Sequence, residues 1–317
     1  MRSSSALQSS LAPQPVTRHG LASGLVAYLM WGLLPIYFIL IEHVRPQEVL
    51  AHRIVWAIPL GAAILLVRKQ WGAVFAALTS VRTLSLLLCS ASLIAVNWFV
   101  YIVAVQNEQV FQASLGYYIN PLVNVAAGML LFGETLRRMQ LVAVFVAAIG
   151  VAVLTVSGGE LPWISLVLAA SFALYGIIRK QISVGAMPGL FVETLFLVPA
   201  AAVYLWLLYR SGAAAFGSST LAFDLLLFAS GPLTVLPLLF FALAARGMPL
   251  SVLGMLQFIA PTLQFLVGLA YGESLTAAHI VCFSLIWIAI VMFASDAWYN
   301  GRRPVAAAGR PADSHSG

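Results

Sequence analysis

The feature that most constrains the fold is a near-continuous series of apolar segments, each about 20 residues long. An α-helix rises about 1.5 Å per residue, so a segment of that length crosses the roughly 30 Å hydrocarbon core of a bilayer. Only 8% of the residues are charged, against about 25% in an ordinary soluble domain. Because lipid offers no hydrogen-bond partners to a peptide backbone, the segments are expected to be helices. The sequence therefore predicts an all-α membrane protein.

Ten membrane-spanning helices are predicted from apolar windows that are bounded by charges and turn-forming residues. The windows cover residues 21–41, 48–67, 83–105, 110–132, 139–156, 161–178, 189–209, 222–244, 250–271 and 278–296. Residues 68–82 include an amphipathic stretch that favours a short helix at the membrane interface. The connections are mostly short, which leaves no room for an inserted catalytic domain.

The basic residues predict which way the chain faces. With ten helices and a cytoplasmic N-terminus, the cytoplasmic side holds Arg2, Arg18, Arg68, Lys69, Arg82, Arg137, Arg138, Arg179, Lys180, Arg246, Arg302, Arg303 and Arg310. The far side holds only Arg45 and Arg210. This asymmetry follows the positive-inside rule and predicts that both the N- and C-termini are cytoplasmic.

An internal repeat divides the chain into two halves. A shift of about 140 residues lays Tyr117, Pro121, Asn124 and Gly128 over Gln257, Pro261, Gln264 and Gly268. Five helices is an odd number, so the two halves are expected to enter the membrane in opposite senses, related by a pseudo-two-fold axis. The predicted organisation is a disordered cytoplasmic leader (1–19), a first repeat (20–157), a second repeat (161–297) and a disordered cytoplasmic tail (300–317).

Arg53 and Glu193 are the most informative ionisable residues, because the repeat aligns them and both lie inside apolar windows. An arginine near the centre of a membrane helix costs about 2.5 to 3.5 kcal/mol on insertion scales, so something must offset that cost. One interpretation is a central site for a polar or charged substrate. The other is a structural ion pair that locks the two halves together.

Further polar residues recur at helical spacing. Glu48 and His52 share one helix face, as do Asn97 and Tyr101, and His52 could line a cavity or relay protons. The matched polar stripes around residues 117–128 and 257–268 could line a cavity or pack helices together. The predicted substrate-binding residues are therefore Arg53, Glu193, His52, Glu48, Asn97, Tyr101, Tyr117, Asn124, Gln257 and Gln264.

Other functional classes lack their signatures. No GxxxxGK[ST], HExxH or GxSxG run occurs, which argues against ATP hydrolysis and against an intramembrane enzyme. Cys89 and Cys282 stand alone in apolar runs, so no metal or other cofactor is predicted. The net charge of +6 comes from dispersed basic residues, which form no face for nucleic acid. The sequence carries no indication of oligomeric state.

Several ordered motifs resemble one known family. They are AYLMWGLLPIYF (27–38), EVLAHRIVW (48–56), NWFVYIVAVQN (97–107), ASLGYYINPLVNV (113–125), SFALYGIIRK (171–180), VETLFLVP (192–199) and LGMLQFIAPTLQF (253–265). From about residue 20 to 297 the chain resembles the RarD-type branch of the drug/metabolite transporter superfamily, whose members carry two EamA-type repeats. The resemblance implies a ten-helix carrier of the bacterial inner membrane and leaves its substrate open.

The leading hypothesis is a secondary transporter or exporter of a small molecule, a drug or a metabolite, that alternates access around a midline cavity. Glu193, Glu48 or His52 could take up a proton if transport is proton-coupled. The alternatives are a membrane scaffold or sensor without transport and, with less support, an intramembrane enzyme. The expected partners are the small-molecule substrate and the lipid bilayer.

Overall fold

The protein is helical throughout the residues that the structure describes. The computed structural model describes residues 17–132, 138–158, 161–218, 220–248, 252–253 and 256–301. Their helices are α2 (Arg18–Leu40), α3 (Pro46–Val67), α4 (Trp71–Thr79), α5 (Val81–Gln106), α6 (Val110–Phe132), α7 (Arg138–Gly158), α8 (Trp163–Lys180), α9 (Ala186–Arg210), α10 (Leu221–Gly247), α12 (Ile259–Ala270) and α13 (Ala277–Gly301).

Many of these helices have the length and composition of membrane spans. Within the described residues, α2, α3, α5, α7, α9 and α10 are long and apolar enough to cross a bilayer. Shorter apolar stretches lie in α8, α12 and α13. The expectation of an all-α, multi-pass membrane protein is therefore confirmed.

The helix boundaries agree with the apolar windows in all but one place. Nine windows match helices whose ends lie within five residues of the expected ones, and α4 falls inside residues 68–82. The window 250–271 is not one continuous helix, because Gln257 and Phe258 form a turn and α12 begins at Ile259. Pro261 explains this start: in the first turn of a helix a missing N–H costs no hydrogen bond, whereas in the interior it would.

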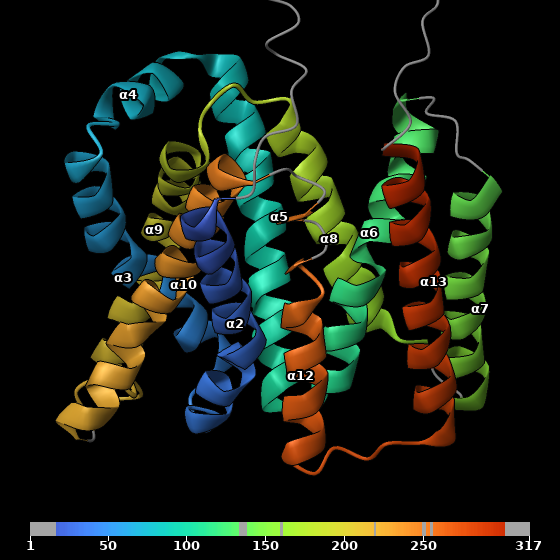
Figure 1. Cartoon of the computed structure of the whole chain (residues 1–317). Helices are drawn as coiled ribbons and strands as arrows, with labels where there is room; N and C mark the ends of the chain where they lie inside the picture. The colour runs from blue at the N-terminus through green and yellow to red at the C-terminus, as the bar shows by residue number, and fades with distance from the viewer. Residues whose placement is uncertain are drawn as a thin grey trace, which may run out of the picture.

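The helices run side by side in alternating directions and mix the two halves of the sequence (Figure 1). Helix α2 packs against α10 and α12, while α8 packs against α5 and α6. Helix α3 packs against α9 and α10, and α6 also touches α12. Helices α7 and α13 pack chiefly against each other, at one side of the bundle in Figure 1. The polar residues considered below lie in α2, α3, α5, α6, α8, α9, α10 and α12 and in the turn before α12.

Small residues allow the closest of these helix contacts. A Cβ atom on Gly32 of α2 would lie 2.7 Å from the Leu263 side chain of α12. A Cβ atom on Gly116 of α6 would lie 2.9 Å from the Ser165 carbonyl oxygen of α8. Such approach is too close for any larger residue, so glycine is required where these helices cross.

Basic residues gather at one end of the bundle. Arg18 begins α2, Arg68 follows α3 and Arg82 lies in the first turn of α5, and these three helix ends point toward the upper end of the bundle in Figure 1. Arg45 precedes α3 and Arg210 ends α9, and these two helix ends point toward the lower end of the bundle in Figure 1. The uneven distribution of basic residues predicted from the sequence is therefore also seen between the two ends of the bundle. That the basic end is cytoplasmic stays a prediction.

Candidate functional site

Arg53 of α3 lies in the interior of the bundle, with only 5% of its surface exposed. Its Nε donates a hydrogen bond of 2.6 Å to Oγ1 of Thr234 on α10. Its Cζ lies 4.4 Å from the ring centroid of Trp98 on α5 and 5.9 Å from that of Phe38 on α2. A guanidinium over an aromatic face gains cation–π attraction, so the charge is stabilised by a hydroxyl and two rings rather than by a carboxylate.

One nitrogen of this arginine and one tyrosine hydroxyl have no hydrogen-bond partner in the described part of the protein. They are Nη1 of Arg53 and the hydroxyl of Tyr101, and both atoms are buried. The rings of Tyr101 and Tyr117 lie 5.7 Å apart, and Tyr101 also packs against Phe38, the ring beside the guanidinium. Buried polar groups are normally hydrogen-bonded, so these donors mark a place prepared for a ligand or for ordered water.

Asn97 of α5 hydrogen-bonds to Tyr117, one of the tyrosines near Arg53. It accepts a hydrogen bond of 3.1 Å from the Tyr117 hydroxyl. Its Nδ2 donates to the Leu168 carbonyl and to Oγ of Ser171, both at 3.0 Å. Asn97 therefore ties α5 to α6 and α8 and orients the ring of Tyr117, while Tyr101, one turn along α5, faces Phe38.

Glu193 of α9 belongs to a different cluster. It is 1% exposed, and its Oε1 accepts a hydrogen bond of 2.6 Å from Ser90 while its Oε2 accepts one of 3.3 Å from Tyr175. Arg179 of α8 approaches Oε1 to 3.5 Å. The ion pair considered between Arg53 and Glu193 is not formed in the structure. The sequence shift of about 140 residues aligns the two residues, and that alignment does not bring them into contact.

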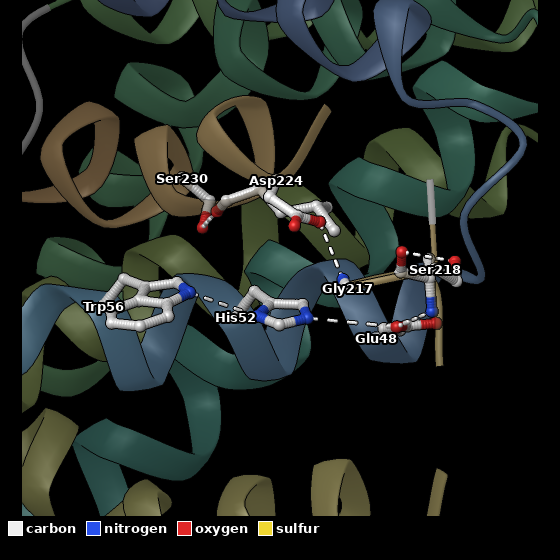
Figure 2. A network of polar contacts seen from close by, with 9 residues as sticks. Glu48, His52, Trp56, Gly217, Ser218, Asp224 and Ser230 are labelled. Carbon is white, nitrogen blue, oxygen red and sulfur yellow. Dashed lines mark hydrogen bonds and ion pairs between the residues drawn. The ribbon is translucent and has the colours of Figure 1, made fainter. Parts of the chain in front are cut away.

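Glu48 and His52 form a polar chain along α3 that Figure 2 shows from close by. Oε1 of Glu48 accepts a hydrogen bond of 2.6 Å from the backbone N–H of Ala215, in the segment between α9 and α10. Nε2 of His52 lies 3.9 Å from the same oxygen, and Nδ1 accepts a hydrogen bond of 3.2 Å from Nε1 of Trp56. An indole N–H can only donate, so His52 carries its proton on Nε2, facing the carboxylate.

The polar stripe predicted around residues 257–268 is only partly formed, because its two glutamines do not lie on one continuous helix. Gln264 of α12 is 3% exposed, and its Nε2 donates to the Trp31 carbonyl of α2 at 3.1 Å. Its Oε1 is buried without a partner among the described residues. Gln257 lies in the turn before α12 and is half-buried. Asn124 lies in α6, and its side chain is outside the described residues.

Sequence reasoning missed two residues that hold these clusters. Arg179 was counted only as a charge at a helix end, yet its guanidinium lies against Gly189 and reaches Glu193. The signal was the short connection between α8 and α9, with a glycine one turn into α9. Thr234 lies in the apolar window of residues 222–244 and was not singled out. A polar residue one turn before it, Ser230, was a sign that this face of α10 is polar.

One groove lies away from these clusters. It has a volume of about 390 Å³ between α12 and α13, and its lining is almost entirely apolar, with Phe258, Leu263 and Trp287 among its residues. Within the described residues no group of three or more His, Cys, Asp or Glu side chains could hold a metal ion. The buried ionisable residues Arg53, Glu193 and Glu48 therefore lie outside this groove.

Comparisons with known proteins give a consistent result. The profile of the EamA-like transporter family matches residues 18–156. "Protein RarD" of Salmonella typhi is 45% identical over 90% of this chain and 98% of its own length. An "Uncharacterized transporter" of Vibrio cholerae is 43% identical over 89% of this chain and 94% of its own. A crystal structure with 19% identity shares the fold, with a TM-score of 0.57 over 90% of this chain and 99% of that one.

Proposed function

The chain belongs to the EamA-like transporter family, and on that premise we propose that it exports a small molecule across the bacterial inner membrane. The family is one of transporters rather than of enzymes. The proposed mechanism is secondary transport by alternating access around a midline cavity, with the substrate a drug or a metabolite. The residues proposed to face that cavity are Arg53, Asn97, Tyr101 and Tyr117.

The packing of the helices supports two inverted five-helix repeats, 20–157 and 161–297. We pair α2 with α8, α3 with α9, α5 with α10, α6 with α12 and α7 with α13. Exchanging the members of each pair turns the contact of α2 with α10 into that of α8 with α5, and the contact of α2 with α12 into that of α8 with α6. The contacts of α3 with α9, α6 with α12 and α7 with α13 map onto themselves. A bundle of this symmetry can rock between two equivalent arrangements.

One observation carries the proposed function: a buried arginine, without a carboxylate partner among the described residues, lies where elements of both proposed repeats meet. An ionisable residue inside a membrane bundle is costly and marks substrate or ion pathways more often than it serves packing alone. Arg53 contacts Thr234 of the second repeat and Trp98 of the first, so rocking of the halves would change its surroundings. That is the property required of a substrate-binding residue in alternating access.

Proton coupling, if it occurs, is assigned to Glu193, Glu48 or His52. The hydrogen bond from Trp56 keeps Nδ1 of His52 unprotonated. Flux with and without an imposed pH gradient would test the coupling, and substitution of each residue would assign it.

The experiment that tests transport compares the metabolites released by cells that carry the wild-type protein, Arg53→Ala, Arg210→Ala or no copy. Arg210 is a matched control, because it also lies over a tryptophan ring, with Cζ 5.7 Å from the centroid of Trp206, but at an exposed helix end. We expect at least one solute to accumulate outside cells with the wild type or Arg210→Ala and not with Arg53→Ala, at equal protein in the membrane. That solute should then move in proteoliposomes. Identical extracellular metabolites in all four strains, with no flux, would contradict transport.

A further inference from the structure

The immediate surroundings of Arg53 carry one positive charge that the described protein does not neutralise. No carboxylate of the described residues lies within 4.0 Å of its guanidinium. The two glutamates that are buried among the described residues are both engaged elsewhere: Glu193 with Arg179, Ser90 and Tyr175, and Glu48 with Ala215 and His52. A buried charge without a counter-ion is costly, so an anion that reaches this place is attracted strongly.

The free donors define where that anion would bind. Nε of Arg53 is occupied by Thr234, whereas Nη1 is buried and free of any partner in the described part of the chain. The hydroxyl of Tyr101 is also buried and unpartnered. A carboxylate has two oxygens and can accept from a guanidinium N–H and from a phenol O–H at the same time. Charge-assisted hydrogen bonds of this kind are the strong ones in proteins.

The side chains around these donors are aromatic. Trp98 covers one face of the guanidinium and Phe38 lies beside it, with its ring centroid 5.9 Å from that of Tyr101, whose ring also contacts Tyr117. Aromatic rings offer area to a ring or a short alkyl chain, and few acceptors to further polar groups. The body of the ligand beyond its charged group is therefore expected to be apolar.

We propose that the Arg53 site binds the carboxylate of an organic monoanion with an apolar body, and this inference rests on the proposed transport function. One guanidinium balances one negative charge, so a phosphate dianion would leave a charge uncompensated. A cation would be repelled. A zwitterion would bring an ammonium group, for which the described carboxylates are already engaged. The site thus selects by net charge as well as by shape.

The test measures binding to the purified full-length protein in nanodiscs. The probes are benzoate and 3-phenylpropanoate, their neutral amides, benzylammonium, phenylglycine as the zwitterion and phenyl phosphate as the dianion. We expect at least one carboxylate to bind, and its amide and the other probes to bind at least tenfold more weakly, because a hydrogen bond to a charged group is lost or opposed.

Three variants locate the binding. Arg53→Gln removes the charge and is expected to weaken carboxylate binding at least tenfold. Tyr101→Phe keeps the ring and removes one donor, so a smaller loss, about threefold to tenfold, is expected. Arg210→Gln makes the same change of net charge at an exposed arginine over Trp206 and should leave binding unchanged. A melting curve without ligand shows that each variant is folded.

The outcomes separate this inference from the proposed function. The inference is overturned if no carboxylate binds, if an amide or ammonium probe binds as well as its carboxylate, or if Arg53→Gln binds like the wild type. A transported solute that depends on Arg53 but is not a monoanion would also overturn it, and transport would stand. Carboxylate binding that requires Arg53, without flux of any solute, would support the binding site and remove the proposed function.

Discussion

At the scale of single residues, the buried Arg53 and the half-buried Arg179 show opposite ways of placing a cation in the bundle. Arg179 reaches a carboxylate, Glu193, at the end of α8. Arg53 reaches a hydroxyl and aromatic rings instead. A buried ion pair can offset much of its own desolvation cost, whereas a cation held by neutral groups keeps its attraction for an outside anion. The first arrangement suits a structural role and the second suits a binding site.

Thr234→Val is expected to destabilise the protein by about 1.5 to 3 kcal/mol, because Nε of Arg53 loses its hydroxyl acceptor while the shape of the side chain is kept. Thr194→Val is the matched control. Thr194 is equally buried, and its hydroxyl bonds only to the Leu190 carbonyl of its own helix. The measurement is the melting temperature in detergent. An equal loss in both variants would mean that the Thr234 hydroxyl does nothing particular for Arg53.

The residue types of the site were predictable, but their partners were not. The cost of an arginine in an apolar window singles out Arg53, and the repeat singles out Glu193. Contact between them depends on how far α3 and α9 are offset along the membrane normal, which spacing in sequence does not encode. Asn97 and Tyr117 likewise stood out as polar residues in apolar helices. Their hydrogen bond to each other depends on how α5 and α6 rotate against each other.

At the scale of helices, close crossings depend on residues without side chains. Gly231 of α10 is the sharpest case, since a Cβ atom there would overlap the backbone of Trp56 on α3. A helix backbone cannot move aside as a flexible side chain can. This crossing lies one turn from Thr234 and therefore also sets the distance between Thr234 and Arg53.

Gly231→Ala is expected to lower stability by about 1 to 3 kcal/mol through overpacking, despite the better helix propensity of alanine. Gly176→Ala is the control, because that glycine of α8 is exposed and has nothing within 4 Å of its Cβ position. It should be neutral or slightly stabilising. Melting temperatures of both variants check the prediction, and a neutral Gly231→Ala would show that α3 and α10 can separate freely.

The existence of the helices followed from apolar length, and their ends followed from charges and turn formers. The one clear miss, the window 250–271, came from treating Pro261 as an interior residue. Hydropathy cannot distinguish a proline in mid-helix from one in a first turn, because both lie in apolar surroundings. The break at Gln257 and Phe258 also removes Gln257 from a regular stripe with Gln264.

At the scale of the whole molecule, the two halves are joined at several points, and one of them is a carboxylate. Glu273 lies between α12 and α13, outside the membrane-spanning helices, and both of its oxygens lie 3.0 Å from the backbone N–H of Phe111 at the start of α6. A carboxylate at a helix N-terminus is favourable for its charged form. Burial opposes this and is the larger effect, so the pKa of Glu273 is raised to about 7, with Glu108 adding to the rise.

The raised pKa predicts how stability depends on pH. Between about pH 5 and pH 7 the folded protein keeps a proton on Glu273 that the unfolded chain, with the ordinary carboxyl pKa, has lost. The stabilising contribution of this residue is therefore fully present at low pH and is lost as pH rises through about 7. The melting temperature of the wild type minus that of Glu273→Gln should fall over this range and become constant above about pH 8. A difference that instead grows with pH would mean that the hydrogen bond to the start of α6, rather than burial, controls the ionisation of this contact between the halves.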